Sequence, residues 1–201
     1  MRLPRPARTA ACFGFLLVAS FTASTTAADP VPKWDPVRTT QPEDLAELKA
    51  LQANVNDVVT KCTPVTVAIL FGNAAGSGVI VNEDGLVLTA AHVIRDYEVS
   101  KKGKEKELPY TSGKKVQMLL PDGTKIEGKT LGINGDIIAG MDSGMIQITT
   151  KGPNNGKWPF APLAKAGTVE KGQWVVSLGH PNGPKTERPP VARLGRVLKA
   201  D

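Results

Sequence analysis

Short apolar segments separated by glycine-containing turns dominate the chain after residue 62 and constrain its fold more than any other feature. Gly78–Val81 and Leu86–Thr89 flank a turn that ends in Asp84-Gly85, and residues 116–133 repeat this pattern around Pro121-Asp122-Gly123. Apolar segments joined by Asp-Gly turns are typical of β-hairpins. The other predicted strands are Val65–Leu70, Met145–Ile148, Trp174–Leu178 and Val191–Lys199. Short strands at such close spacing predict a β-barrel or a β-sandwich.

One helix is expected before these strands, over residues 41–61. Thr40 and Pro42, followed by acidic residues, are typical of a helix start. Six apolar side chains then recur at helical spacing: Leu45, Leu48, Leu51, Val55, Val58 and Val59. We expect this apolar stripe to pack on the domain. Gly and Pro together make up 36 of the 201 residues, against a usual share of roughly 12%, and this excess of turn formers argues against a helix bundle.

The first 28 residues have the pattern of a secretory signal peptide. Arg2, Arg5 and Arg8 precede an uncharged stretch over residues 10–23, and small residues follow over residues 25–28. A membrane anchor is the alternative, but it needs about 20 strongly apolar residues, and this stretch is shorter and contains Ser and Thr. We therefore expect an exported protein, periplasmic or extracellular, that is not inserted in a membrane after cleavage. Residues 29–40, rich in Pro and Thr, are expected to form a flexible leader.

Composition excludes several functional classes. Basic residues exceed acidic ones by 6, but without the three arginines of the leader the excess is only 3, which is too weak and too scattered to indicate a nucleic-acid partner. The chain has two His and two Cys, and nothing is spaced for a four-ligand zinc site. Gly72–Gly78 lacks the lysine and the glycine spacing that nucleotide-binding motifs need. Cys12 falls within the signal peptide, which leaves the pairing state of Cys62 open.

A histidine and an aspartate stand at strand ends where they could act together. His92 follows the strand that ends at Thr89 and comes after two small residues, and Asp142 opens a later apolar strand. Such an aspartate can accept the Nδ1 hydrogen of a histidine and fix its tautomer. A histidine considered alone is more often structural. The catalytic interpretation therefore depends on the presence of both His92 and Asp142. Asp136 is the alternative acid, because it could also open a strand, but the alternation after Asp142 is cleaner.

The segment around His92 resembles the trypsin-like serine proteases, in particular their bacterial Deg/HtrA-like branch. That branch has Gly-Ser-Gly, two apolar strands around an Asp-Gly turn, and then Thr, two small residues, His and Val, as residues 76–93 do. Residues 142–148 are similar to the family's Asp-x-Ala-x-Leu segment, with Gly144 in the alanine position. Residues 172–183 resemble the stretch with Gly-x-Pro-x-Gly that opens the second barrel. The resemblance covers the chain from about Val58 to its last residue.

The resemblance implies an all-β fold with one N-terminal helix, built as a trypsin-like double β-barrel. The first barrel, residues 62–150, would be complete, and residues 151–201 would form a linker and the start of an incomplete second barrel. His92 would be the general base and acid, and Asp142 would orient it. The implied function is peptide-bond hydrolysis on protein or peptide substrates, without a metal or cofactor. His180, where the family often has Asn, is interpreted as a surface turn residue.

The third member of the family's triad, a serine in Gly-(Asp/Asn)-Ser-Gly-Gly, has no match in the chain. Ser143 adjoins the acid, Ser177 lies inside a strand pattern, and Ser77 lies in a turn before the histidine motif. Counting from Asp142, the family's serine would fall beyond Asp201. We therefore expect the chain to be the N-terminal portion of a secreted serine endopeptidase. This portion would lack the nucleophilic serine.

Two other functions are compatible with this sequence. The first is a non-catalytic, protease-like binding module of the cell envelope, and the second is a structural β-domain that only resembles the family. A downstream serine motif in the same frame would favour the protease. The sequence gives no indication of the oligomeric state or of the cleavage specificity.

Overall fold

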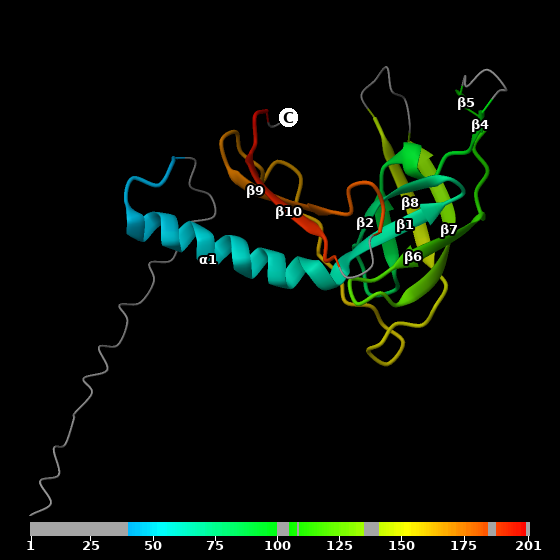
Figure 1. The fold of residues 1–201 in the computed structure, drawn as a ribbon, viewed down its shortest axis with the longest axis horizontal. Coiled ribbons are helices and arrows are strands. Elements are labelled where there is room, and N and C mark those ends of the chain that lie inside the picture. The colour runs from blue at the N-terminus through cyan, green and yellow to red at the C-terminus, as the bar shows by residue number, and fades with distance from the viewer. Residues whose placement is uncertain (1–39, 100–104, 108, 135–140, 185–187, 200–201) are drawn as a thin grey trace, which may run out of the picture. The chain divides into compact units, whose positions relative to one another are not determined.

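A computed structural model describes residues 40–99, 105–107, 109–134, 141–184 and 188–199 of the chain. Its elements are one long helix, a closed six-stranded barrel and two small two-stranded sheets (Figure 1). This composition confirms the prediction of an all-β fold with one N-terminal helix. The predicted signal peptide and residues 29–39 of the predicted leader lie outside the described residues.

The barrel is antiparallel throughout and closes on itself in the order β1-β2-β3-β8-β7-β6. Its strands are β1 (Thr66–Phe71), β2 (Ala74–Ile80), β3 (Leu86–Thr89), β6 (Lys115–Leu119), β7 (Lys125–Asn134) and β8 (Ser143–Ile148). The two predicted Asp-Gly hairpins are the β2–β3 and β6–β7 pairs. Gly85 and Gly123 have φ values of +85° and +84° in their turns, a conformation that glycine adopts at little cost.

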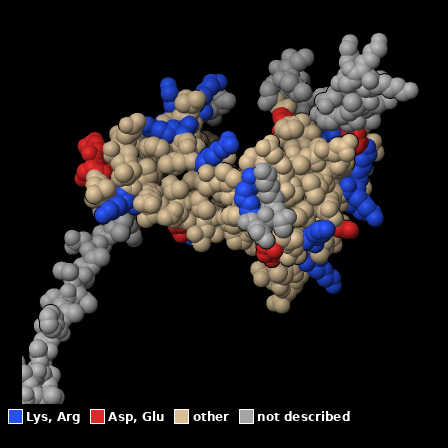
Figure 2. All heavy atoms as spheres, viewed as in Figure 1, with Lys and Arg blue, Asp and Glu red and all other residues tan. Residues whose placement is uncertain are grey.

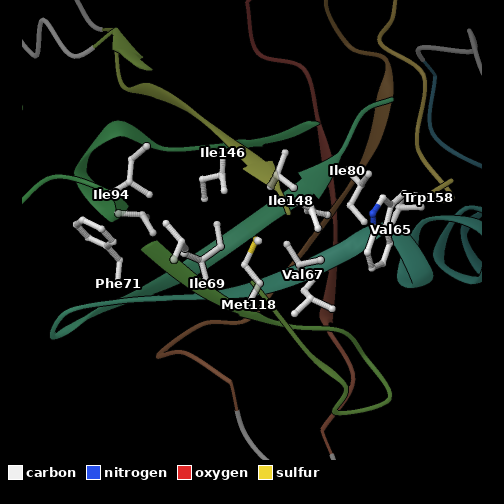
Figure 3. Packing of buried hydrophobic residues seen from close by; sticks show 14 residues of the cluster. Val65, Val67, Ile69, Phe71, Ile80, Ile94, Met118, Ile146, Ile148 and Trp158 are labelled. Carbon is white, nitrogen blue, oxygen red and sulfur yellow. The ribbon is translucent and has the colours of Figure 1, made fainter. Parts of the chain in front are cut away.

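The side chains that point into the barrel form one hydrophobic core. In β7 the buried positions alternate with exposed ones, and Ile126, Gly128 and Thr130 all face inward, as the two-residue period of a strand requires. Figure 3 shows Phe71 and Ile94 at one end of the cluster and Trp158 at the other. The other members of the cluster are Val65, Val67, Ile69, Ile80, Val87, Val93, Val116, Met118, Ile126, Ile146 and Ile148. This core fixes the strand ends that carry the candidate site.

Several predicted strand limits were wrong. Strand β2 begins at Ala74 rather than Gly78, because Ala74 already pairs with Phe71 across a tight turn. Glu105–Glu107 form a further strand, β5, which the sequence patterns did not predict and which pairs with β4 (Tyr97–Val99). Residues 100–104, between these two strands, lie outside the described residues.

Helix α1 spans Leu45–Cys62 and begins later than predicted. Its N-cap is Asp44, whose Oδ1 accepts a hydrogen bond from the Glu47 N–H at 2.8 Å, while the Glu47 carboxylate accepts one from the Glu43 N–H at 2.8 Å. This arrangement resembles a capping box, except that the Glu47 carboxylate reaches the residue before the N-cap, and it satisfies backbone donors that the first turn of a helix leaves free. The capping signal at Thr40 was therefore misplaced.

The apolar stripe of α1 packs only in its middle. Ala50 and Leu51 are buried and contact Val55 and Trp174, whereas Leu45 and Leu48 remain 65% and 53% exposed. The expectation that the stripe would pack on the domain was therefore wrong for Leu45 and Leu48, near the start of the helix.

A second sheet contains β9 (Trp174–Gly179) and β10 (Val191–Arg196), which pair antiparallel with each other. Trp174 joins this sheet to the helix region, because its indole N–H donates to the Thr40 carbonyl at 3.2 Å. The Arg196 guanidinium lies 5.2 Å from the centroid of the same ring, close enough for a cation–π contact. A complete first barrel followed by an incomplete second one was predicted, and this arrangement is confirmed.

Two glycines of β7 provide a matched test of the packing. A Cβ at Gly128 would lie 2.7 Å from the Gln147 carbonyl oxygen and 2.8 Å from Ile146 Cγ2, whereas a Cβ at Gly132 would meet no atom within 4 Å. We expect Gly128→Ala to lower the free energy of unfolding by about 1–3 kcal/mol, the usual range for overpacking. Gly132→Ala should change it by less than about 1 kcal/mol. Urea unfolding of the two variants measures both values, and equal losses would contradict the packing described.

Candidate active site

Strand β3 and a short 3-10 turn position His92. The strand ends at Thr89, whose hydroxyl donates to the Ser77 carbonyl of β2 at 2.8 Å. Ala91 and Val93, on either side of the histidine in the turn η2 (Ala91–Val93), are buried, whereas 63% of the His92 side chain is exposed. The two buried neighbours anchor the turn in the core, so the imidazole is held on the surface by a rigid support.

Strand β8 positions Asp142, the residue immediately before its first member. The β3–β8 ladder pairs Thr89 with Gly144 and thereby brings Asp142 beside the turn that carries His92. A Cβ at Gly144 would lie 2.8 Å from Ile94 Cδ1. The missing side chain at Gly144 therefore allows the strand and the turn to approach closely.

His92 and Asp142, fifty residues apart in the sequence, form two hydrogen bonds. The His92 backbone N–H donates to Asp142 Oδ1 at 3.0 Å, and His92 Nδ1 lies 2.6 Å from Asp142 Oδ2. A carboxylate that accepts the Nδ1 hydrogen fixes the tautomer in which Nε2 is free to accept a proton. Nε2 makes no hydrogen bond to any residue that the structure describes. The two residues that were expected to act together are thus in contact in the structure.

The hydrogen bonds also favour the ionised form of the carboxyl group. The His92 backbone N–H, and to a smaller extent its imidazole, lower the pKa of Asp142 below the ordinary value of 3.8, and they outweigh the opposing effect of burial. Asp142 is therefore ionised at neutral pH. An ionised carboxylate at this position can stabilise a positive charge that develops on the imidazole.

The other residues considered from the sequence are placed differently. Asp136 lies outside the described residues. Ser77 Oγ accepts a hydrogen bond from the His180 backbone N–H at 2.7 Å, Ser143 starts β8 opposite Asn134, and Ser177 lies in β9 opposite Arg193. No serine of the described residues forms a hydrogen bond with His92. The described part of the barrel therefore presents a histidine–aspartate pair whose histidine is not hydrogen-bonded to a serine.

His180 does not lie on the surface as predicted, because only 5% of it is exposed. Its backbone hydrogen bond to Ser77 attaches the turn after β9 to β2. A Cβ at Gly179 would lie 2.9 Å from the Ser77 hydroxyl oxygen, so the close approach depends on glycine. The role of Ser77 was missed, although its position between two glycines was a signal that other backbone approaches it closely.

Metal-ligand clusters, basic patches or long apolar helices among the described residues would indicate other functions. No three His, Cys, Asp or Glu residues gather as metal ligands within the described ranges. Figure 2 shows the Lys and Arg side chains dispersed over the drawn face, so its charge gives no support for a nucleic-acid partner. No helix among the residues that could be placed is long and apolar enough to cross a bilayer.

Comparison with known proteins agrees with this geometry. Residues 76–201, more than half of the chain, match the family described as "Trypsin-like peptidase domain". The chain is 30% identical over 138 residues to "Serine protease HTRA2, mitochondrial" of Bos taurus, which covers 63% of this chain and 25% of the relative. It is 26% identical over 149 residues to the "Probable periplasmic serine endoprotease DegP-like" of Rickettsia conorii, which covers 69% of this chain and 23% of the relative.

A solved structure shows the same fold. The serine endoprotease from Yersinia pestis superposes with a TM-score of 0.50 at 19% identity, over 72% of this chain and 44% of that one. The present chain spans about a quarter of the length of the curated relatives named above. The chain thus belongs to the trypsin-like peptidase domain family, and the two relatives named above are an HTRA and a DegP-like serine protease.

Proposed function

We propose that this chain is the N-terminal part of an exported serine endopeptidase in which His92 is the general base and acid and Asp142 orients it. The observation that carries the proposal is the 2.6 Å contact between His92 Nδ1 and Asp142 Oδ2, together with an Nε2 that has no protein partner among the described residues. This is the arrangement that a histidine needs to accept a proton from a nucleophile.

The proposed reaction is hydrolysis of a peptide bond. Nε2 of His92 takes the hydroxyl proton of a serine as that serine attacks the substrate carbonyl, and the resulting imidazolium then donates the proton to the leaving amine. Asp142 stays ionised throughout, because its hydrogen bonds with His92 keep its pKa low. A water molecule, activated by the same histidine, releases the acyl group in the second half of the reaction.

We propose that the nucleophilic serine lies in a part of the protein that follows Asp201. Two observations support this. The Ser77 hydroxyl is already occupied by the His180 backbone N–H, while Ser143 and Ser177 are fixed in strands without a hydrogen bond to His92. The relatives, moreover, are about four times as long as the segment that matches. Protein or peptide substrates would bind beside His92.

Export is proposed from the pattern of the first 28 residues. Three arginines, an uncharged apolar stretch and small residues before Asp29 make up the three parts of a secretory signal. One relative is described as periplasmic. N-terminal sequencing of the protein isolated from its source should therefore begin near Asp29. A protein that retains Met1 or the leader arginines would contradict export with cleavage.

Kinetics of the complete protein test the catalytic roles. In a peptide-hydrolysis assay, His92→Ala should lower kcat by about 10⁶-fold, the usual loss when a triad member that moves the proton is removed. Asp142→Asn should lower kcat by about 10⁴-fold, because an amide holds the imidazole in the wrong tautomer. The changes in KM should be small by comparison, since neither side chain is proposed to bind substrate.

Asp57→Asn is the matched control for Asp142→Asn. Asp57 lies on α1 and forms an exposed salt bridge with Lys61, with 2.7 Å between Asp57 Oδ2 and Lys61 Nζ. Exposed salt bridges of this kind contribute little to the free energy of unfolding. The control should keep the activity of the wild-type protein. An unchanged kcat in His92→Ala would show that this histidine is not the base. A complete wild-type protein without hydrolytic activity would favour the non-catalytic binding module.

A further inference from the structure

A cavity of about 380 Å³ lies away from the His92–Asp142 pair, at the β6–β7 turn. Leu119, Leu120 and Pro121 line it from the barrel, and His180, Pro184 and Arg188 line it from the segment after β9. In the barrel order, β2 and β1 separate the strand of His92 from β6. The cavity is therefore distinct from the candidate active site, and nothing in the proposed proteolysis uses it.

Two residues that line this cavity, His180 and Arg188, carry unpaired polar groups. His180 is almost fully buried, and neither of its ring nitrogens has a hydrogen-bond partner, nor does the buried Nε of Arg188, within the part of the chain that the structure describes. The Arg188 guanidinium is nevertheless held in place, because Nη2 donates to the Pro181 carbonyl at 3.0 Å. Buried polar groups in folded proteins are almost always paired. At least two N–H donors, one on each side chain, therefore lack an acceptor among the described residues.

Charge defines what could satisfy these groups. Arg188 and Lys125 are cationic, and Asp122 is the one acid that lines the cavity among the described residues. The Asp122 carboxylate already accepts a hydrogen bond from the Thr124 N–H at 2.8 Å, which, with other hydrogen bonds, lowers its pKa. The cavity is thus net positive, and it contains N–H donors without acceptors. These are the requirements for binding an anion.

The rest of the cavity lining is mostly aliphatic, and it indicates which kind of group the anion would carry. Ala68, Leu119, Leu120 and Pro184 contribute apolar surface next to the nitrogens. Such a surface favours an alkyl chain over a fully hydrated ion. Burial and, next, the Arg188 charge lower the pKa of His180, and they outweigh the opposing effect of the nearby Thr66 backbone. The ring is therefore neutral at pH 7 and has a single N–H donor, which does not meet hydrogen-bond geometry with any group among the described residues.

We propose that this cavity binds a carboxylate carried on a short aliphatic group, with the carboxylate accepting hydrogen bonds from the Nε of Arg188 and a ring N–H of His180. The aliphatic part would contact Leu119, Leu120 and Pro184. The same chemistry is present in a free short-chain fatty acid and in the C-terminal residue of a peptide. The proposal does not depend on the catalytic roles given to His92 and Asp142.

Calorimetric titration of the complete protein tests the site with four probes. Hexanoate and acetyl-Ala-Leu carry the carboxylate, and hexanamide and acetyl-Ala-Leu-amide are their neutral counterparts. We expect at least one acid to bind at least tenfold more tightly than its amide. Binding of hexanoate alone identifies a free acid as the ligand, and binding of the dipeptide acid alone identifies a peptide C-terminus. Equal binding of acids and amides, or no binding of either acid at millimolar concentration, overturns the proposal.

Variants then locate the binding site. Arg188→Gln should weaken binding of the acid at least tenfold, because it removes the charged Nε–H donor. His180→Gln should weaken binding as well, because the amide of Gln would hold its N–H donor in a different position. Arg193→Gln on β10 is the control, since Arg193 is exposed and lies outside the cavity lining, and it should bind as the wild-type protein does. Unchanged affinity in a folded Arg188→Gln variant, checked by circular dichroism, contradicts the proposed site. If a variant does not fold, the comparison of acid and amide on the wild-type protein still decides the question.

Discussion

The pairing of β3 with β8 is the interaction on which the candidate active site depends. It places Thr89 opposite Gly144, so the turn after β3 and the residue before β8 meet at the same edge of the barrel. The register is enforced by burial, because a slip by one residue would turn Val87 and Ile146 from the core to the surface. The contact between His92 and Asp142 is thus fixed by hydrophobic packing rather than by the hydrogen bonds alone.

Closure of the barrel extends this rigidity to the rest of the site. Pairing of β1 with β6 leaves no free edge in the six-stranded sheet, and each strand supplies inward side chains to one core (Figure 3). Ala91 and Val93 belong to the buried part of the turn that carries His92. A base that must transfer a proton at a fixed distance needs such a support, because small displacements of a catalytic group reduce the rate strongly.

Local patterns predicted the hairpins and placed His92 and Asp142 at strand ends, whereas the choice of a barrel over a sandwich came from the resemblance to the trypsin-like proteases. Asp-Gly turns and alternating apolar residues mark the hairpins, and His92 and Asp142 stand at the ends of predicted strands. The start of α1 was misplaced because Asp44 competes with Thr40 as a cap, and the Asp44–Glu47 hydrogen bond favours the later start. The burial of His180 was missed because it depends on contact with Ser77, a residue more than one hundred positions away.

Labelling of the complete protein with a fluorophosphonate, followed by identification of the modified peptide, tests the central claim most directly. Such reagents form a covalent bond with a serine that a neighbouring base activates. The account predicts one labelled serine, located beyond Asp201, and loss of the label in His92→Ala. A label on Ser77, Ser143 or Ser177, or labelling that persists without the imidazole of His92, would contradict it.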